Sequence, residues 1–251
     1  MRADSGRWEK HVSQELTAWM QLRHANVLEL LGVCAHGRYG LAMVAPWMEF
    51  GHVLDYLKEH PGAPRSPLLL DAARGLNYLH TLNPPIAHGD VRAANILVKV
   101  SHEACLADFG LARILLEIRD SQTSESESFT MGNERWMAPE RFSNEFTSTA
   151  SITPAADVYS FGMVIYEVYT GLKPYHHLLN RYFVPLEIIS GRRPQRPGPE
   201  ESAQTGFSEE MWVIANDCWK ETREERPLAA GLVARLEFIA EPRMMTSATD
   251  G

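Results

Sequence analysis

The sequence has no long apolar run, few cysteines and no excess of positive charge. No stretch approaches the ~18 apolar residues of a membrane span, and residues 1–6 lack the apolar segment of a signal peptide. The three cysteines, Cys34, Cys105 and Cys218, form no CxxC pair and have no histidine at metal-ligand spacing. These absences predict an intracellular, cytoplasmic protein without a membrane span, whose thiols are reduced and buried.

The charge balance of the chain is acidic. The net charge is −8 and the isoelectric point is near 5.7, which argues against a broad basic face for nucleic acid and against adhesion to anionic membranes. With 251 residues, 45% of them hydrophobic and 22% charged, the chain falls in the range of ordinary globular proteins and can bury a sizeable core. We therefore expect proteins, and no nucleic acid, among its macromolecular partners.

The first part of the chain is predicted to form a helix, then a hairpin and then two further helices. Apolar residues recur at helical spacing from about Trp8 to Leu22, which predicts a helix that ends before Asn26. Two β-rich runs, residues 27–33 and 41–45, predict a hairpin. Helices are predicted at residues 53–57 and 68–80, with a proline-bounded loop at 61–67 between them. The change of pattern predicts a boundary near residues 46–51.

The second part of the chain is predicted to be mainly helical. Strongly apolar helices are expected at residues 155–170 and 208–220, separated by a proline- and arginine-rich segment at 191–197. Residues 121–128 are polar and too poor in apolar side chains to pack, so a mobile loop is expected there. The tail after Ala240 is expected to be frayed. The fold class predicted from these patterns is α+β.

Three short motifs occur in a fixed order. They are His88-Gly89-Asp90-Val91-Arg92-Ala93-Ala94-Asn95, then Asp108-Phe109-Gly110, thirteen residues after the end of the first, and then Ala138-Pro139-Glu140. Each motif alone is weak evidence, but their joint order and spacing resemble the eukaryotic protein kinases. The resemblance covers about residues 10–236. It implies a bilobal protein-kinase-like fold, with an incomplete small β-rich N-lobe and a mainly α-helical C-lobe.

The resemblance implies an enzyme that uses ATP and Mg²⁺ to phosphorylate a protein substrate. By this resemblance, Asp90 accepts the proton of the substrate hydroxyl, and Asn95 and Asp108 hold the metal ions. Carboxylate and amide oxygens are ligands that Mg²⁺ prefers, and phosphoryl transfer depends mainly on positioning and charge neutralisation. Arg92 is implied to contact the transferred phosphate as a fixed charge.

The same resemblance implies a set of ATP-binding residues. Ala45 to Met48 would form the hinge beside adenine, with Ala45 controlling access to the pocket behind it and backbone groups of Met48 bonding to the purine. The resemblance also places Leu97 among the ATP-binding residues. Glu15 occupies the position of the helix glutamate that pairs with the ATP-binding lysine. Neither the glycine-rich phosphate loop nor the strand lysine occurs before Glu15, which suggests a chain truncated at its N-terminus. Lys10, only five residues before Glu15, is expected to be a solvated charge rather than a replacement for that lysine.

Several further residues resemble structural residues of the kinase family. Asp157 resembles the buried aspartate that anchors the catalytic-loop backbone, and Arg226 resembles the partner of Glu140. A buried charge is costly unless it is paired, so structural roles are expected for both. Four residues occupy the positions of the hydrophobic column that links the lobes of an active kinase, with plain core packing as the alternative: His88, Phe109, Trp19 and Leu30.

Two positions depart from the pattern of the family. Gly89 replaces the arginine that in many kinases captures a phosphate on the activation loop, so that switch is not expected here. Asn133 matches neither the threonine of serine/threonine kinases nor the proline of tyrosine kinases. Residues 90–95 resemble tyrosine kinases, whereas residues 132–140 resemble serine/threonine kinases. The tyrosine-kinase-like group is therefore the best placement, with serine and threonine favoured over tyrosine as substrates.

Two functions are compatible with these residues. The first is a protein kinase domain in which residues 1–48 form a partial N-lobe, 49–240 the C-lobe and 241–251 a disordered tail. The alternative is a catalytically weak, kinase-shaped binding module that regulates protein partners by contact. The absence of the phosphate loop and the lysine motivates this alternative, because loss of one preorganised electrostatic contact typically costs ~10²–10³ in rate.

Overall fold

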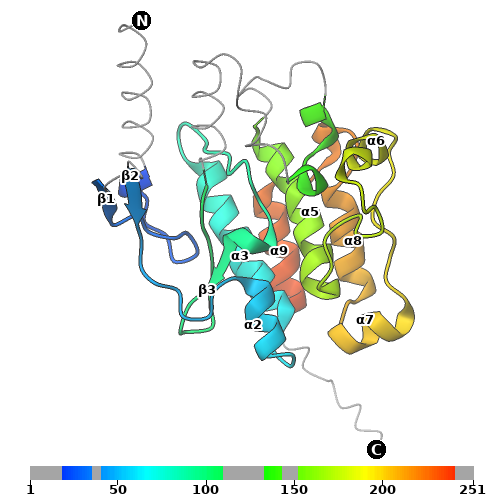
Figure 1. The fold of residues 1–251 in the computed structure, drawn as a ribbon, viewed down its shortest axis with the longest axis horizontal. Coiled ribbons are helices and arrows are strands. Elements are labelled where there is room, and N and C mark those ends of the chain that lie inside the picture. The colour runs from blue at the N-terminus through cyan, green and yellow to red at the C-terminus, as the bar shows by residue number, and fades with distance from the viewer. Residues whose placement is uncertain (1–18, 36–40, 110–132, 143–151, 241–251) are drawn as a thin grey trace, which may run out of the picture.

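The computed structural model describes residues 19–35, 41–109, 133–142 and 152–240 (Figure 1). These residues form a mainly helical structure with a few short strands. The predicted helix at 8–22 is described only at its end, where Trp19–Gln21 is helical and the helix stops before Asn26, as predicted. Glu15, the polar loop at 121–128 and the tail after Ala240 lie outside the described residues.

The strands form two separate antiparallel pairs. β1 (Gly32–Ala35) pairs with β2 (Leu41–Val44), and β3 (Ile96–Val98) pairs with β4 (Ala104–Leu106). The predicted hairpin is therefore present, and β3 begins directly after Asn95. In Figure 1 the pair β1–β2 stands at one end of the molecule, beside the helices rather than among them.

The predicted start of the first strand at Val27 is wrong. Val27 forms a parallel bridge with Leu106, and the backbone N–H of Leu28 donates to the carbonyl of Leu106 at 2.8 Å. In return, the N–H of Leu106 donates to the carbonyl of Asn26 at 2.9 Å. The apolar run beginning at Val27 therefore pairs first with β4, and only its end at Gly32 joins β1. The sequence pattern cannot distinguish these two partners.

Four long helices form the core of the helical part of the structure. α3 (Arg65–Thr81) packs against α9 (Ala229–Ala240), and α5 (Pro154–Thr170) packs against α8 (Glu209–Cys218). Figure 1 shows these helices side by side, with α5 in the middle of the layer. α5 is buried around most of its circumference, as expected of a central helix that is apolar on all sides. Thr153 caps its start, and Gly171 ends it in the left-handed conformation with φ 69°.

The remaining helical elements are short. They are α2 (Val53–Glu59), α6 (Val184–Ile189) and α7 (Pro199–Thr205), together with the 3₁₀ turns η2 (Ala93–Asn95), η3 (Glu134–Trp136), η4 (Pro139–Phe142), η6 (Arg181–Phe183) and η7 (Arg223–Glu225). No helix in the described ranges is long and apolar enough to cross a membrane.

The structure corrects two details of the sequence prediction. α3 begins at Arg65 rather than Leu68, because Pro67 lies in the first turn, where its missing N–H would have had no partner in the helix. Cys34 is exposed, whereas Cys105 and Cys218 are buried as predicted. Burial raises the pKa of the Cys105 thiol to about 11 and raises that of Cys218 further. Cys34 differs because it lies on β1, in a sheet of only two strands.

Glycines allow two close approaches between elements. A Cβ atom on Gly75 of α3 would lie 2.2 Å from the carbonyl oxygen of Asn26, and one on Gly162 of α5 would lie 2.8 Å from Cβ of Cys218. By contrast, a Cβ atom on Gly231 of α9 would meet nothing closer than Pro227 at 3.9 Å. The separations of α3 from Asn26 and of α5 from α8 therefore depend on the absence of these side chains.

We predict opposite effects on stability for two helical Gly→Ala substitutions. Helix propensity alone would make either alanine stabilising by about 1 kcal/mol. Gly231→Ala should show this gain, whereas Gly162→Ala should destabilise the protein by about 1–3 kcal/mol through overpacking against α8. Urea unfolding of both variants measures the difference. Equal effects of the two substitutions would show that α5 and α8 are not in contact at Gly162.

Candidate active site

The loop at residues 88–95 is fixed by the first turn of α5. The Asp157 carboxylate accepts hydrogen bonds from the backbone N–H groups of His88 at 2.7 Å and Gly89 at 2.8 Å. His80 Nε2 lies 2.9 Å from the same carboxylate, and Asp157 is only 2% exposed. The predicted anchoring contact of Asp157 is therefore confirmed. Gly89 has φ 81°, a conformation that glycine adopts at little cost.

The Asp90 side chain is held by two amides. Asn95 Nδ2 donates to Asp90 Oδ2 at 2.9 Å and to the Asp90 carbonyl at 2.8 Å. Asn133 Nδ2 donates to Asp90 Oδ1 at 2.8 Å. Each carboxylate oxygen therefore has one amide donor. Because Asn95 uses its nitrogen in both bonds, its amide oxygen stays available as an acceptor.

The Arg92 side chain contacts Asn133 and Trp136. Its Nη1 donates to Asn133 Oδ1 at 3.0 Å, and its guanidinium lies 6.0 Å from the centre of the Trp136 ring. Its Nε lies 3.4 Å from Asp90 Oδ2, but this buried nitrogen makes no hydrogen bond to any residue that the structure describes. Arg92 therefore keeps one unused donor next to the Asp90 carboxylate.

Glu167 supports this part of the site from α5. Its Oε2 accepts bonds from the Ala93 N–H at 3.0 Å and from Trp136 Nε1 at 2.9 Å. Burial raises the pKa of the Glu167 carboxyl, although both bonds favour its charged form. The carboxylate thus ties the loop after Arg92 to the 3₁₀ turn that follows Asn133.

Asp108 lies at the end of β4, next to the loop that holds Asp90. The N–H of Ala107 donates to the carbonyl of Asn95 at 2.8 Å, so the residues just before Asp108 are bonded to the other predicted metal ligand. Asp108 is exposed and has φ 57°. Aspartate tolerates this left-handed conformation better than most residues, and such conformations concentrate at functional sites.

Three aromatic rings form a continuous column behind the site. The rings of Trp19 and Phe109 are 4.4 Å apart, and those of Phe109 and His88 are 6.3 Å apart. The structure therefore brings Trp19, Phe109 and His88 together, and Leu30 lies in the same large buried core as Trp19 and Phe109. Burial lowers the pKa of His88 against the opposing effect of Asp157 and Asp90, which favours the neutral form of its ring.

The residues predicted to contact adenine also meet. Ala45, Met48 and Leu97 pack against one small apolar cluster formed by Leu28, Cys105 and Ala107. The carbonyl of Met48 accepts a bond from the Gly51 N–H at 3.1 Å, and the Gly51 carbonyl accepts one from the Val98 N–H at 2.9 Å. These bonds tie residues 48–51 to β3. Two members of this cluster are close in sequence to the predicted metal ligands, since Leu97 lies two residues after Asn95 and Ala107 directly precedes Asp108.

Sequence reasoning missed three functional candidates. Asn133 was noted only as a departure, and nothing singled out Glu167. The third is Arg141, which is 7% exposed and donates through Nη1 to the Gly89 carbonyl at 2.9 Å. Burial lowers the pKa of Arg141, while Asp157 and Asp90 oppose this shift. The residues around Arg141 in the sequence do not predict this contact, because the contact joins residues that are far apart in the chain.

Glu140 and Arg226 form the predicted pair. Arg226 Nη1 and Nη2 donate to the two Glu140 oxygens at 2.7 Å and 2.8 Å. The remaining donors of Arg226 bond to the carbonyls of Lys220, Ala155 and Glu221, and its side chain is fully buried. A bidentate pair with all donors used is the arrangement in which a buried charge is tolerated.

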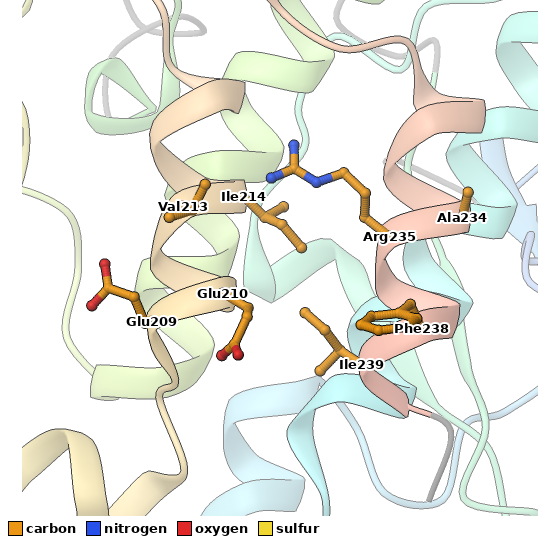
Figure 2. Close-up of a pocket in the computed structure, with 8 residues that line it drawn as sticks. All are labelled: Glu209, Glu210, Val213, Ile214, Ala234, Arg235, Phe238 and Ile239. Carbon is orange, nitrogen blue, oxygen red and sulfur yellow. The ribbon is translucent and has the colours of Figure 1, made fainter. Parts of the chain in front are cut away.

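An apolar cavity of about 510 Å³ lies elsewhere, between α8 and α9. Figure 2 shows that its walls come from these two helices, with Phe238 and Ile239 opposite Val213 and Ile214. None of the predicted site residues lines it. The cavity is therefore separate from the site around Asp90.

We predict that Arg226→Lys destabilises the protein by about 3 kcal/mol, because lysine cannot satisfy the bidentate partner and the three carbonyls. Arg223→Lys is the matched control. Its partner Glu224 is adjacent and its side chain is 57% exposed, so its effect should stay within about 0.5 kcal/mol. Thermal and urea unfolding measure both. Equal effects would contradict a structural role for the Glu140–Arg226 pair.

Comparison with known proteins adds an independent finding. Residues 2–236 match the family model described as protein tyrosine and serine/threonine kinase. The chain is 31% identical over 239 residues to serine/threonine-protein kinase STY46 of Arabidopsis thaliana, covering 93% of this chain and 38% of that protein. It is 32% identical over 265 residues to proline-rich receptor-like protein kinase PERK3 of the same plant, covering 96% and 49%.

A mammalian protein is similar to the same degree. Receptor-interacting serine/threonine-protein kinase 3 of Rattus norvegicus is 31% identical over 230 residues, which cover 87% of this chain and 46% of that protein. The chain thus spans less than half the length of each of these relatives.

Proposed function

The chain belongs to the protein tyrosine and serine/threonine kinase family, and we propose that it transfers the γ-phosphate of ATP to serine or threonine hydroxyls of a protein. The observation that carries this proposal is the Asp90 carboxylate held between the amides of Asn95 and Asn133. A carboxylate fixed at both oxygens is suited to accept and orient a hydroxyl, because positioning is the main task of a kinase site.

The residues present fit Mg²⁺. Asp108 offers a carboxylate and Asn95 an amide oxygen, both hard oxygen ligands. No cluster of three or more His, Cys, Asp or Glu side chains that could hold an ion occurs within the described ranges. This agrees with an ion that is held by one or two side chains together with water and phosphate oxygens. When bound, Mg²⁺ would neutralise charge on the phosphates.

Each side chain has a separate role in the proposed reaction. Asp90 accepts the proton of the substrate hydroxyl as the hydroxyl oxygen attacks. Asn133 and Asn95 keep the carboxylate from rotating, since each donates to one of its oxygens. Arg92 places a permanent positive charge beside Asp90, with its Nε 3.4 Å from Asp90 Oδ2, and this fixed charge would contact the phosphoryl group as it is transferred. Asp108 and Asn95 would hold the metal.

The proposed nucleotide lies between two lobes. We assign residues 1–48 to a partial N-lobe, 49–240 to the C-lobe and 241–251 to a tail. The packing of Ala45, Met48 and Leu97 on one apolar cluster supports an adenine site at the boundary between the lobes. An apolar floor with backbone polar groups at its edge is the usual character of such a site.

Two observations favour serine and threonine over tyrosine. The printed names of the plant kinase STY46 and of the rat kinase both specify serine/threonine. In addition, the Asn133 side chain accepts from Arg92 and donates to Asp90, a bridge that the proline found at this position in tyrosine kinases could not form, since proline has no side-chain donor.

The test is phosphotransfer from [γ-³²P]ATP with Mg²⁺ to peptides that contain serine, threonine or tyrosine, comparing the chain with Asp90→Asn. We expect incorporation into serine and threonine peptides that falls by at least about 100-fold in the variant, because the general base is lost. Circular dichroism would confirm that both proteins are folded. Equal signals from both proteins would remove the kinase proposal. No signal from either would show that the chain without the lysine and the phosphate loop is inactive, and would favour a binding module that regulates partners by contact.

We predict a graded effect at Asn133. Asn133→Ala removes the donor to Asp90 and should lower kcat by about 10- to 100-fold, since a misplaced catalytic group costs up to that much. Asn133→Thr should lose less, because a hydroxyl can also donate to Asp90 and accept from Arg92. The KM for ATP should change little in either variant.

A remote amide serves as the control. Asn216 on α8 donates to the Trp212 carbonyl at 2.8 Å, and Asn216→Ala should leave kcat unchanged. If Asn133→Ala and Asn216→Ala had the same kcat, the bridge between Asp90 and Arg92 would have no part in the reaction.

A further inference from the structure

Large apolar side chains are exposed together on the helical run that contains η6 and α6. We call them the α6 patch: Leu179 (98% exposed), Tyr182 (67%), Phe183 (55%), Leu186 (59%) and Ile189 (51%). η6 continues directly into α6, so positions 182, 186 and 189 recur at the spacing of one helical face. Folded proteins rarely expose so much adjoining apolar surface unless it binds something.

The opposite face of α6 is firmly attached to the protein. Val184 and Ile188 are both fully buried, and α6 packs against η3 and η4. Leu186 and Ile189 are therefore exposed on a helix that is packed against the rest of the protein, and not on a detached helix. In Figure 1, α6 stands at the outer edge of the molecule, beyond the upper end of α8.

The segment that carries the patch is basic, unlike the rest of the chain. Residues 172–196 contain five lysines and arginines against a single carboxylate, Glu187, in a chain whose net charge is −8. Glu187 is already paired with Arg192. Lys173 acts electrostatically on Glu167, and Arg196 is paired with Glu209. In the described part of the chain, no carboxylate pairs with Arg181, whose guanidinium lies 5.4 Å from the centre of the Tyr182 ring. Apolar side chains and a cation without a carboxylate partner thus occur on the same segment.

The segment is linked directly to the candidate active site. Arg135 donates through Nη1 to the Pro174 carbonyl at 2.9 Å and through Nη2 to the Leu178 carbonyl at 2.7 Å. Arg135 lies in η3, two positions after Asn133, which bonds to Asp90. One short turn therefore holds both the carboxylate at the site and the segment that leads into the patch.

We propose that the α6 patch is a docking surface for an acidic, apolar segment of the protein substrate, separate from the hydroxyl that is phosphorylated. The identification of the docked protein as substrate rests on the proposed function. Apolar side chains spaced at three or four residues would pack on Tyr182, Leu186 and Ile189, and aspartate or glutamate would pair with Arg181. Docking raises the local concentration of the hydroxyl at Asp90.

Charge argues against two other occupants. In a symmetric dimer through this patch, the Arg181 side chains of the two copies would approach each other, and like charges across an interface are unfavourable. An anionic membrane would attract the basic segment, but it would repel a protein of net charge −8. An acidic protein segment avoids both conflicts.

The first experiment identifies the chemistry of the ligand. Random 12-residue peptides displayed on phage are selected on the immobilised chain and counter-selected on Leu186→Glu. We expect enriched peptides that combine Asp or Glu with apolar residues three or four positions apart, and that bind at least about tenfold more weakly to Leu186→Glu. Leu228→Glu is the matched control, because Leu228 is also exposed, at 79% against 59% for Leu186, but lies outside the patch, and it should bind normally.

A charge reversal makes the result specific. Arg181→Glu should weaken the selected peptides, and a peptide in which one acidic residue is replaced by lysine should recover binding to Arg181→Glu. Peptides without acidic residues, or peptides that bind Leu186→Glu as well as the unaltered chain, would overturn the inference. So would a dimer in sedimentation velocity, or binding to phosphatidylserine vesicles, that is abolished by Leu186→Glu.

The second experiment separates docking from catalysis. The selected peptide is joined by a Gly/Ser linker to a serine/threonine peptide that the chain phosphorylates. We expect the KM of the joined peptide to fall by at least about tenfold on the unaltered chain and not on Leu186→Glu, while the simple peptide is phosphorylated equally by both. Normal phosphorylation without a gain from joining would overturn docking alone. Absence of phosphorylation of either peptide, with binding that depends on the patch, would overturn the proposed function and leave a partner that is not a substrate.

Discussion

The two hydrogen bonds from the backbone of His88 and Gly89 to Asp157 are the interaction on which the candidate site depends. They attach an irregular loop to the first turn of α5, the most deeply buried helix of the described core. A buried carboxylate requires partners, and here the backbone of the loop supplies them. Since Asp90 is the next residue, the position of its backbone follows from this contact between main chain and core, while Asn95 and Asn133 orient its carboxylate.

Around this anchor, single side chains connect several elements. Asn133 bonds to both Asp90 and Arg92, Glu167 bonds to both Ala93 and Trp136, and Arg141 bonds to the Gly89 carbonyl. All these residues are buried or partly buried, where hydrogen bonds are strong and unpaired groups are costly. The site is therefore a connected network, and the loss of one member is expected to disturb its neighbours as well.

The sequence predicted those features that depend on local pattern or on family motifs. The helices near α3, α5 and α8, the anchoring by Asp157 and the pair of Glu140 with Arg226 were all anticipated. The partner of Val27 was not, because an apolar run does not specify which strand it joins. Nor were the roles of Asn133, Arg141 and Glu167, whose contacts join residues 43, 52 and 74 positions apart. Such pairs form only when the whole chain packs, so the spacing of residues along the sequence does not predict them.

The unequal burial of the thiols has a practical consequence. The chain contains three cysteines, and Cys34 alone is exposed, while burial raises the pKa of both others and so suppresses their thiolates. A maleimide dye should therefore label this chain at one position without any cysteine having to be removed. Because that position is on β1, at the end of the molecule away from α6, its fluorescence would report how the small sheet responds to nucleotide while the helical part remains unlabelled.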